Sequence, residues 1–222
     1  FQNNDEIRPT GWFIGSTAFV TKKKKKISNI ETNDIYALEW KINKNYINKE
    51  EAPVWLDKIT STFWLRDANY FISYNRSSQK IKEFLSYADI EIDGIIYINQ
   101  TTVIELLNSI WGFDSQILWK KIDWDNFSLI LSTLVEAKVY KKGTLWTPKQ
   151  ILFDIWNEFV ENLKTRWNIS DILKILLKDI KSRDIVIFSF DSKENSLLWK
   201  FWLNWYFDFN NTLDYNYPVF TS

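Results

Sequence analysis

The sequence predicts an α/β fold, because short apolar runs of strand length alternate with longer stretches whose apolar residues recur at helical spacing. The clearest strand is the continuous apolar run Ile95–Asn99. A helix with a capping box at Thr102 and Glu105 follows it directly. A second apolar run, Ile185–Phe188, follows the helical stretch that Ser170 opens. A strand that leads straight into a helix is typical of an α/β layer.

The N-terminal third predicts a loop, a hairpin and a further strand. Residues 3–20 are polar up to Pro9 and then alternate into apolar side chains, as a loop that feeds a strand does. The lysine run Lys22–Lys26 predicts the solvated tip of a hairpin, the alternative being a run that docks phosphates. The apolar run 35–38 predicts another strand, with Asp34 before it as a turn residue or, alternatively, as an acid of the site.

The other helices are marked by residues that favour helix starts. These are Ser77 or Ser78, Asp125–Asn126, Thr147–Pro148 and Ser170. The apolar residues that follow recur every three or four positions, so we interpret these faces as core. No linker is long enough to divide the chain, and we expect a single domain over residues 1–222.

Composition excludes several classes of function. The chain has 28 basic and 28 acidic residues and neither histidine nor cysteine. Balanced charge argues against nucleic acid as a partner. The missing residue types exclude disulfides, thiolate chemistry, a serine-histidine triad and most zinc sites. Any catalysis must use carboxylates, arginine, lysine, tyrosine or hydroxyl groups.

The chain starts at Phe1 and contains no methionine. No apolar run approaches the roughly 18 residues of a membrane helix, and no signal peptide opens the sequence. We therefore expect a fragment that lacks an upstream membrane anchor and some C-terminal sequence. Contact with a membrane would occur only through that anchor.

Tryptophan is in surplus and glycine is scarce. The 222 residues include 13 tryptophans and 5 glycines, whereas average usage predicts roughly 15 glycines. Trp12, Trp111 and Trp146 stand where turns or helix ends favour a small residue. One hypothesis is that many of these positions are UGA codons that the source organism reads as glycine; thirteen UGG codons would refute it. The alternative is an aromatic surface that stacks on sugars.

Two polar clusters form the candidate site. They contribute two arginines with acidic and amide side chains: Asp5, Glu6 and Arg8 in the first, and Arg66, Asp67 and Asn69 in the second. Two guanidinium groups at strand ends would suit a phosphate or pyrophosphate. A nearby carboxylate would hold a divalent cation or accept a proton from an attacking hydroxyl. The alternative is an ion network that ties two loops together.

Three motifs carry a resemblance to a known family. NNDEIRPTGWFIGS, WLRDANY and IDGIIYINQTTVIELLNSIWG resemble QNNxELRPTGGFIGS, LRDANW and VDGVIAIDPxxLxxLLxxTG of an uncharacterised bacterial family of anchored cell-envelope proteins. The resemblance runs from Phe1 to about Phe190. Trp12 and Trp111 fall on family glycines, which supports the recoding hypothesis. Ser73 stands where the family commonly has an aspartate, and the loss of that acid bears on catalysis rather than on fold.

That family is distantly similar to the LytR-CpsA-Psr enzymes, which transfer glycopolymers from a lipid pyrophosphate carrier onto the cell wall using arginines, aspartates and magnesium. The likeness implies a three-layer α/β/α sandwich with a mixed central sheet. It implies that Arg66 and Asp67 are catalytic and that Asp67 holds Mg²⁺. It also implies that Arg8 binds the pyrophosphate of the substrate. From their place in the two polar clusters, we expect Glu6 and Asn69 to bind substrate as well.

From this resemblance we expect an extracytoplasmic, membrane-anchored domain of the cell envelope that binds a phosphorylated or polyprenyl-linked glycan, or a cell-wall polymer. As an enzyme it would be a glycopolymer phosphotransferase. The alternative is a non-enzymatic surface or scaffold domain in which the same cluster is structural. Transfer requires both arginines to converge on an open pocket beside an acid, whereas a scaffold would show them buried and paired.

Overall fold

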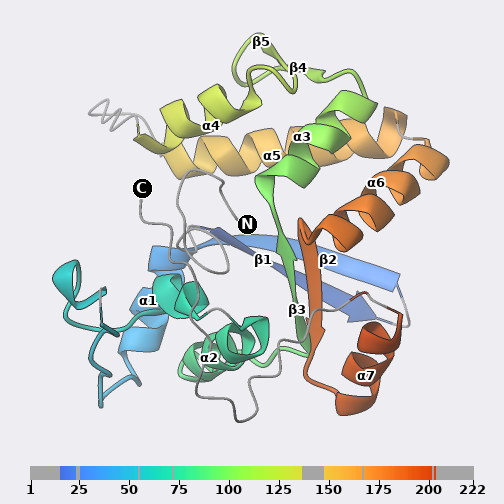
Figure 1. Cartoon of the computed structure of the whole chain (residues 1–222). Coiled ribbons are helices and arrows are strands. Elements are labelled where there is room, and N and C mark those ends of the chain that lie inside the picture. Colours follow the sequence, from blue (N-terminus) through green and yellow to red (C-terminus); the bar gives the residue numbers. More distant parts are fainter. Residues whose placement is uncertain are drawn as a thin grey trace. The chain divides into compact units, whose positions relative to one another are not determined.

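A computed structural model describes residues 16–23, 26–54, 56–71, 73–136, 148–166, 168–201 and 203. Within these ranges the chain forms seven α-helices, two 3₁₀ helices and six strands, so the mixed α/β class is confirmed (Figure 1). None of the described helices has the length and the apolar composition that crossing a bilayer requires.

The chain divides into two compact units, residues 1–99 with 185–222, and residues 100–184. That residues 1–222 form a single domain stays a prediction. The described strands form three antiparallel pairs, β1–β2, β3–β6 and β4–β5. The mixed central sheet and the three layers also stay predictions.

The first unit contains nine described elements. They are β1 (Ser16–Lys23), β2 (Lys26–Asp34), α1 (Ile35–Asn43), the 3₁₀ helices η1 (Leu56–Lys58) and η2 (Leu65–Tyr70), α2 (Tyr74–Ser86), β3 (Gly94–Ile98), β6 (Ile185–Ser189) and α7 (Ser192–Lys200). β1 and β2 pair antiparallel from Ser16 opposite Asp34 to Lys23 opposite Lys26, with a one-residue register shift between Thr21 and Lys22, and this confirms the predicted hairpin.

The strand predicted over residues 35–38 is wrong, because these residues begin helix α1. Asp34 caps the helix: its Oδ1 accepts a hydrogen bond from the Tyr36 N–H at 3.1 Å. Ile35, Leu38 and Ile42 are buried. Their spacing of three and four residues places them on one face of the helix. Burial of that face in the core favours a helix here, although the four consecutive apolar residues alone are equally compatible with a strand.

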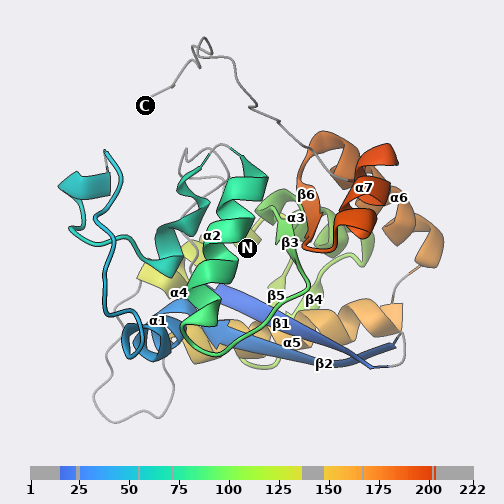
Figure 2. The ribbon, with the colours of Figure 1, turned by 90° about the horizontal axis from the view of Figure 1, so that it is seen from below.

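Strands β3 and β6 form the predicted apolar pair, and they lie side by side in both views (Figure 1, Figure 2). Ile95, Tyr97 and Val186 belong to the core of this unit. A Cβ atom on Gly94 would lie 2.5 Å from the carbonyl oxygen of Phe188. Glycine is therefore needed where the two backbones approach.

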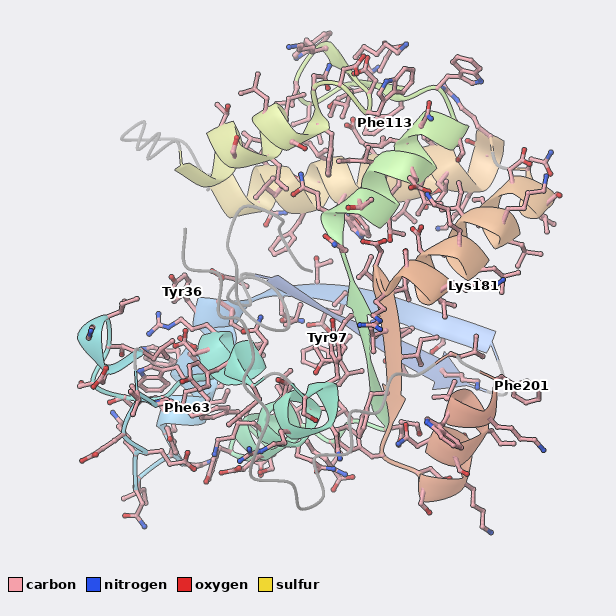
Figure 3. All side chains as sticks on the ribbon, in the orientation of Figure 1. Tyr36, Phe63, Tyr97, Phe113, Lys181 and Phe201 are labelled. Carbon is pink, nitrogen blue, oxygen red and sulfur yellow. The ribbon has the colours of Figure 1, made fainter. Side chains whose placement is uncertain are left out.

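Aromatic side chains dominate this core. Tyr46, Phe63 and Phe84 are almost fully buried, and their rings meet edge to face at centroid distances of 5.5 and 5.7 Å (Figure 3 labels Phe63). The hydroxyl of Tyr97 lies 2.9 Å from that of Ser78, and burial raises the pKa of Tyr97 (Figure 3). The edge-to-face aromatic pairs stabilise the core beyond the burial of their surface and favour one arrangement of its side chains.

The second unit contains α3 (Gln100–Ser109), β4 (Phe113–Ser115), β5 (Lys120–Ile122), α4 (Phe127–Glu136), α5 (Pro148–Arg166) and α6 (Ile169–Ser182). Its core includes Val103, Leu107, Phe113 and Phe159 (Figure 3 labels Phe113). The capping box is wrong: α3 starts at Gln100, and Thr102 lies buried inside the helix.

Helix α3 is followed by a turn at Trp111, whose backbone has a left-handed conformation. The Gly112 N–H donates to the Leu107 carbonyl at 2.9 Å, and the Trp111 N–H donates to the Asn108 carbonyl at 3.0 Å. This is a Schellman motif, whose left-handed residue is usually glycine. Trp111 has φ +59° and is 75% exposed. Trp119, in the turn between β4 and β5, has φ +53° and is 87% exposed. Both are backbone positions that favour glycine, as the recoding hypothesis requires.

We expect Trp111→Gly and Trp119→Gly each to raise the free energy of unfolding by about 1 kcal/mol, because glycine removes the strain of a side chain at positive φ. Trp40, also exposed but inside α1, is the matched control. Trp40→Gly should lower stability by about 0.5 kcal/mol through helix propensity. Chemical denaturation measures all three; destabilisation by both turn variants would contradict the hypothesis.

One buried acid lies on the core face of α6. Asp179 is fully buried, and the buried hydroxyl of Thr102 on α3 lies near its carboxylate without forming a well-aligned hydrogen bond within the described residues. Burial raises the pKa of Asp179; the neighbouring Thr102 lowers it by less, Glu105 and Asp184 raise it further, and Lys178 lowers it. Folding therefore shifts this carboxyl group towards its protonated form relative to the unfolded chain.

Because the folded-state pKa of Asp179 lies above the unfolded value of about 3.9, unfolding free energy should fall as pH rises from that value to the folded pKa. The slope is about 1.4 kcal/mol per pH unit in that window. Asp179→Asn should remove this slope. Asp171→Asn, on the exposed side of the same helix, should keep it. Urea denaturation between pH 4 and 8 tests this, and identical slopes in wild type and Asp179→Asn would contradict it.

Candidate functional site

The described half of the candidate site lies on η2. Arg66, Asp67 and Asn69 all belong to this short helix. Arg8, Glu6 and Asp5 lie outside the described residues. The convergence of Arg8 and Arg66 on one anion therefore stays a prediction.

Helix η2 is anchored by its apolar side chains and kinked at its end. Leu65 and Ala68 are buried in the core, and Asp67 and Asn69 are buried beside them. Asn69 leaves helical geometry, with φ −85° and ψ 16°. The N-cap position holds Trp64, whose side chain makes no capping hydrogen bond. The first amides of a helix need an acceptor, so one must come from elsewhere.

That acceptor is Glu39 of α1, which the sequence analysis missed. The Arg66 backbone N–H donates to Glu39 Oε1 at 3.0 Å. Glu39 is 6% exposed and lies 27 positions before Arg66 in the sequence. Its carboxylate does for η2 what an N-cap side chain does for most helices, and its charge suits the positive end of the helix.

Two carboxylates and one aromatic ring lie next to the Arg66 guanidinium group. Its Nη1 lies 3.6 Å from Glu39 Oε2, and its Nε lies 3.8 Å from Asp67 Oδ2. Its guanidinium carbon lies 5.2 Å from the centre of the Tyr36 ring. These N–O distances exceed the 2.7–3.2 Å usual for hydrogen bonds, and in the described part of the chain the guanidinium group donates none. With 28% of the side chain exposed, its donors can still bind an anion.

Burial and charge set the protonation of Glu39. Burial raises the pKa of its carboxyl group, whereas the hydrogen bond from the Arg66 N–H and the charge of the guanidinium lower it. Asp67 and Asp34 raise it further by repulsion. Two acids, Glu39 and Asp67, thus lie within 4 Å of the Arg66 guanidinium group, and nearby negative charge makes Glu39 harder to ionise.

The described residues include no group of three acidic side chains arranged to hold a metal ion. Mg²⁺ often takes only one or two carboxylates and completes its shell with water and substrate phosphates. Asp67 fits such a role as a single carboxylate next to an arginine. Magnesium at Asp67 remains a prediction.

Ser73 has a structural role. It stands where the family with the similar motifs commonly has aspartate. It is the N-cap of α2, and its Oγ lies 3.5 Å from the Arg76 N–H that donates to it. The predicted caps Ser77 and Ser78 are wrong, since both lie inside α2. Serine and aspartate are equally good N-caps. The exchange therefore preserves this local structure.

The second unit has an acidic hollow that does not include the candidate site. Its volume is about 580 Å³, and its lining includes Asp114, Asp154, Glu158 and Glu161. Glu158 accepts hydrogen bonds from the Ser115 hydroxyl at 2.6 Å and from the Gln116 N–H at 2.9 Å. This acid thereby holds the turn after β4, and Arg66 is not among the residues that line the hollow.

We expect Glu39→Ala to lower the free energy of unfolding by about 2 kcal/mol, because it leaves the partly buried Arg66 N–H without its charged acceptor. Glu91→Ala, the same change at an exposed glutamate, should alter stability by less than about 0.5 kcal/mol. Urea denaturation at pH 7 compares the two. Equal effects would show that Glu39 does not anchor η2.

Comparison with known proteins identifies the family but no characterised relative. No curated protein and no solved structure matches the chain. A family model described as protein of unknown function (DUF4012) matches residues 1–131, which include η2 and all the candidate site residues. This confirms the expected membership of an uncharacterised family. Because the match covers more than half of the 222 residues, the chain belongs to the DUF4012 family.

Proposed function

We propose that this protein is an extracytoplasmic domain of the cell envelope that binds a phosphorylated or polyprenyl-linked glycan through Arg66. The observation that carries this proposal is the exposure of the Arg66 guanidinium group together with its hydrogen-bond donors, which no described residue uses. Arg66 is partly exposed and ordered by two carboxylates and a tyrosine ring. In the described residues, however, its side chain donates no hydrogen bond, so the planar fork is available for a phosphate.

Each residue of the cluster has a role in this proposal. Arg66 binds the phosphate, and Asp67 holds Mg²⁺ or accepts a proton from an attacking hydroxyl group. Arg8 provides a second positive charge, and Glu6 and Asn69 contact the substrate. Glycopolymer transfer, the three-layer sandwich and the likeness to LytR-CpsA-Psr enzymes belong to the same proposal. Their support is the motif resemblance around Arg8, Arg66 and Asp67.

A second candidate function is a non-enzymatic surface or scaffold domain. One observation favours it: two buried carboxylates, Glu39 and Asp67, already lie within 4 Å of the Arg66 guanidinium group. Two carboxylates against one guanidinium leave a surplus of negative charge when both are ionised. That surplus repels an anionic ligand, and the cluster would then serve to tie η2 to α1.

The two candidates differ in ligand binding. We expect farnesyl pyrophosphate with Mg²⁺ to bind the wild-type protein. Arg66→Ala and Arg8→Ala should each weaken binding about tenfold or more, as the loss of a charge-assisted hydrogen bond predicts. Arg66→Lys keeps the charge without the planar fork and should give an intermediate loss. Isothermal titration calorimetry measures the affinities.

Arg166→Ala, in the second unit, is the control and should bind like the wild type. Near-ultraviolet circular dichroism checks that each variant is folded. Binding that is unchanged in Arg66→Ala, or absent from the wild type, would overturn the ligand-binding proposal, and unchanged binding in Arg8→Ala would remove the role of Arg8. Loss of stability without loss of binding in Arg66→Ala would support the scaffold function.

A further inference from the structure

We propose that Glu39 is a positioning residue, which orients Arg66 for an anionic phosphate ligand. This inference rests on the proposed function of Arg66. Glu39 belongs to no sequence motif described above, and it lies on α1 rather than on η2. It holds Arg66 at two points, the backbone N–H at 3.0 Å and the guanidinium Nη1 at 3.6 Å.

The first contact fixes the place from which the arginine extends. Glu39 Oε1 accepts the amide that the Trp64 N-cap leaves unsatisfied. Because this amide is at the start of η2, the bond sets the position of the Arg66 backbone relative to α1. The carboxylate is buried, and a buried charge that accepts a hydrogen bond is held firmly by its surroundings.

The second contact restricts the side chain. Tyr36 and Glu39 are three positions apart on α1 and so project from one side of it. The ring of Tyr36 lies against the guanidinium group, and Glu39 Oε2 faces its Nη1. An arginine loses up to about 2 kcal/mol of rotamer entropy when it is fixed. Restriction before binding reduces that cost when a ligand arrives.

Glu39 has two opposing effects on an anion. Its hydrogen bond to the Arg66 N–H and its ion pair with the guanidinium group orient Arg66, which favours binding. Its negative charge, close to the same guanidinium, disfavours binding. Glutamine at this position keeps a carbonyl oxygen that can accept the Arg66 N–H but has no charge. Alanine removes both. The two substitutions should therefore change anion affinity in opposite directions, which a residue needed only for stability would not do.

Inorganic pyrophosphate is the probe, titrated by calorimetry at pH 7 into wild type, Glu39→Gln and Glu39→Ala. We expect Glu39→Gln to bind several-fold more tightly than wild type and Glu39→Ala about tenfold more weakly. Glu91→Gln, at an exposed glutamate, should bind as wild type. Glu39→Asp keeps the charge on a shorter side chain and should weaken binding, which provides a second test if Glu39→Ala does not fold.

The outcomes separate this inference from the proposed function. If the wild type fails to bind pyrophosphate, or if Arg66→Ala binds as well as wild type, both proposals are wrong. If the wild type binds and Arg66→Ala does not, the function stands. Equal affinity of wild type and folded Glu39→Ala, or equal weakening by the glutamine and alanine variants, would then remove the positioning role of Glu39 alone.

Discussion

The hydrogen bond from the Arg66 amide to the Glu39 carboxylate is the constraint on which the candidate site depends. It supplies the acceptor that η2 lacks at its start and connects that helix to α1. The same carboxylate faces the guanidinium group at 3.6 Å. One buried acid thus determines both where the arginine begins and where its side chain lies, whether the cluster binds a ligand or only holds the unit together.

Part of this site could be predicted from sequence, because LRDAN places Arg66, Asp67 and Asn69 on one short segment. Glu39 could not be found in the same way, since it lies outside the motifs and the strand predicted over residues 35–38 gave it no role. The signal was present in the helical spacing of Ile35, Leu38 and Ile42. That spacing places Glu39 beside Leu38 on the buried side of α1.

For the fold, local chemistry predicted the elements better than their ends. The β1–β2 hairpin and the apolar strands β3 and β6 are confirmed. Helix starts were less reliable, because several residues near each start can cap: Ser73 was used instead of Ser77. At the end of α3 the residue type itself is misleading: Trp111 has φ +59°, a backbone conformation that favours glycine. The division into two units depends on contacts between segments far apart in the sequence, and hydrophobic periodicity does not predict such contacts.

A double-mutant cycle between Glu39 and Arg66 tests the central claim most directly. The unfolding free energies of the wild type, Glu39→Gln, Arg66→Ala and the double variant give the coupling between the two side chains, apart from the backbone bond that glutamine retains. A coupling energy of about 0.5–1 kcal/mol is expected for a partly buried ion pair at 3.6 Å. A coupling of zero, with additive losses, would mean that Glu39 does not hold the arginine side chain.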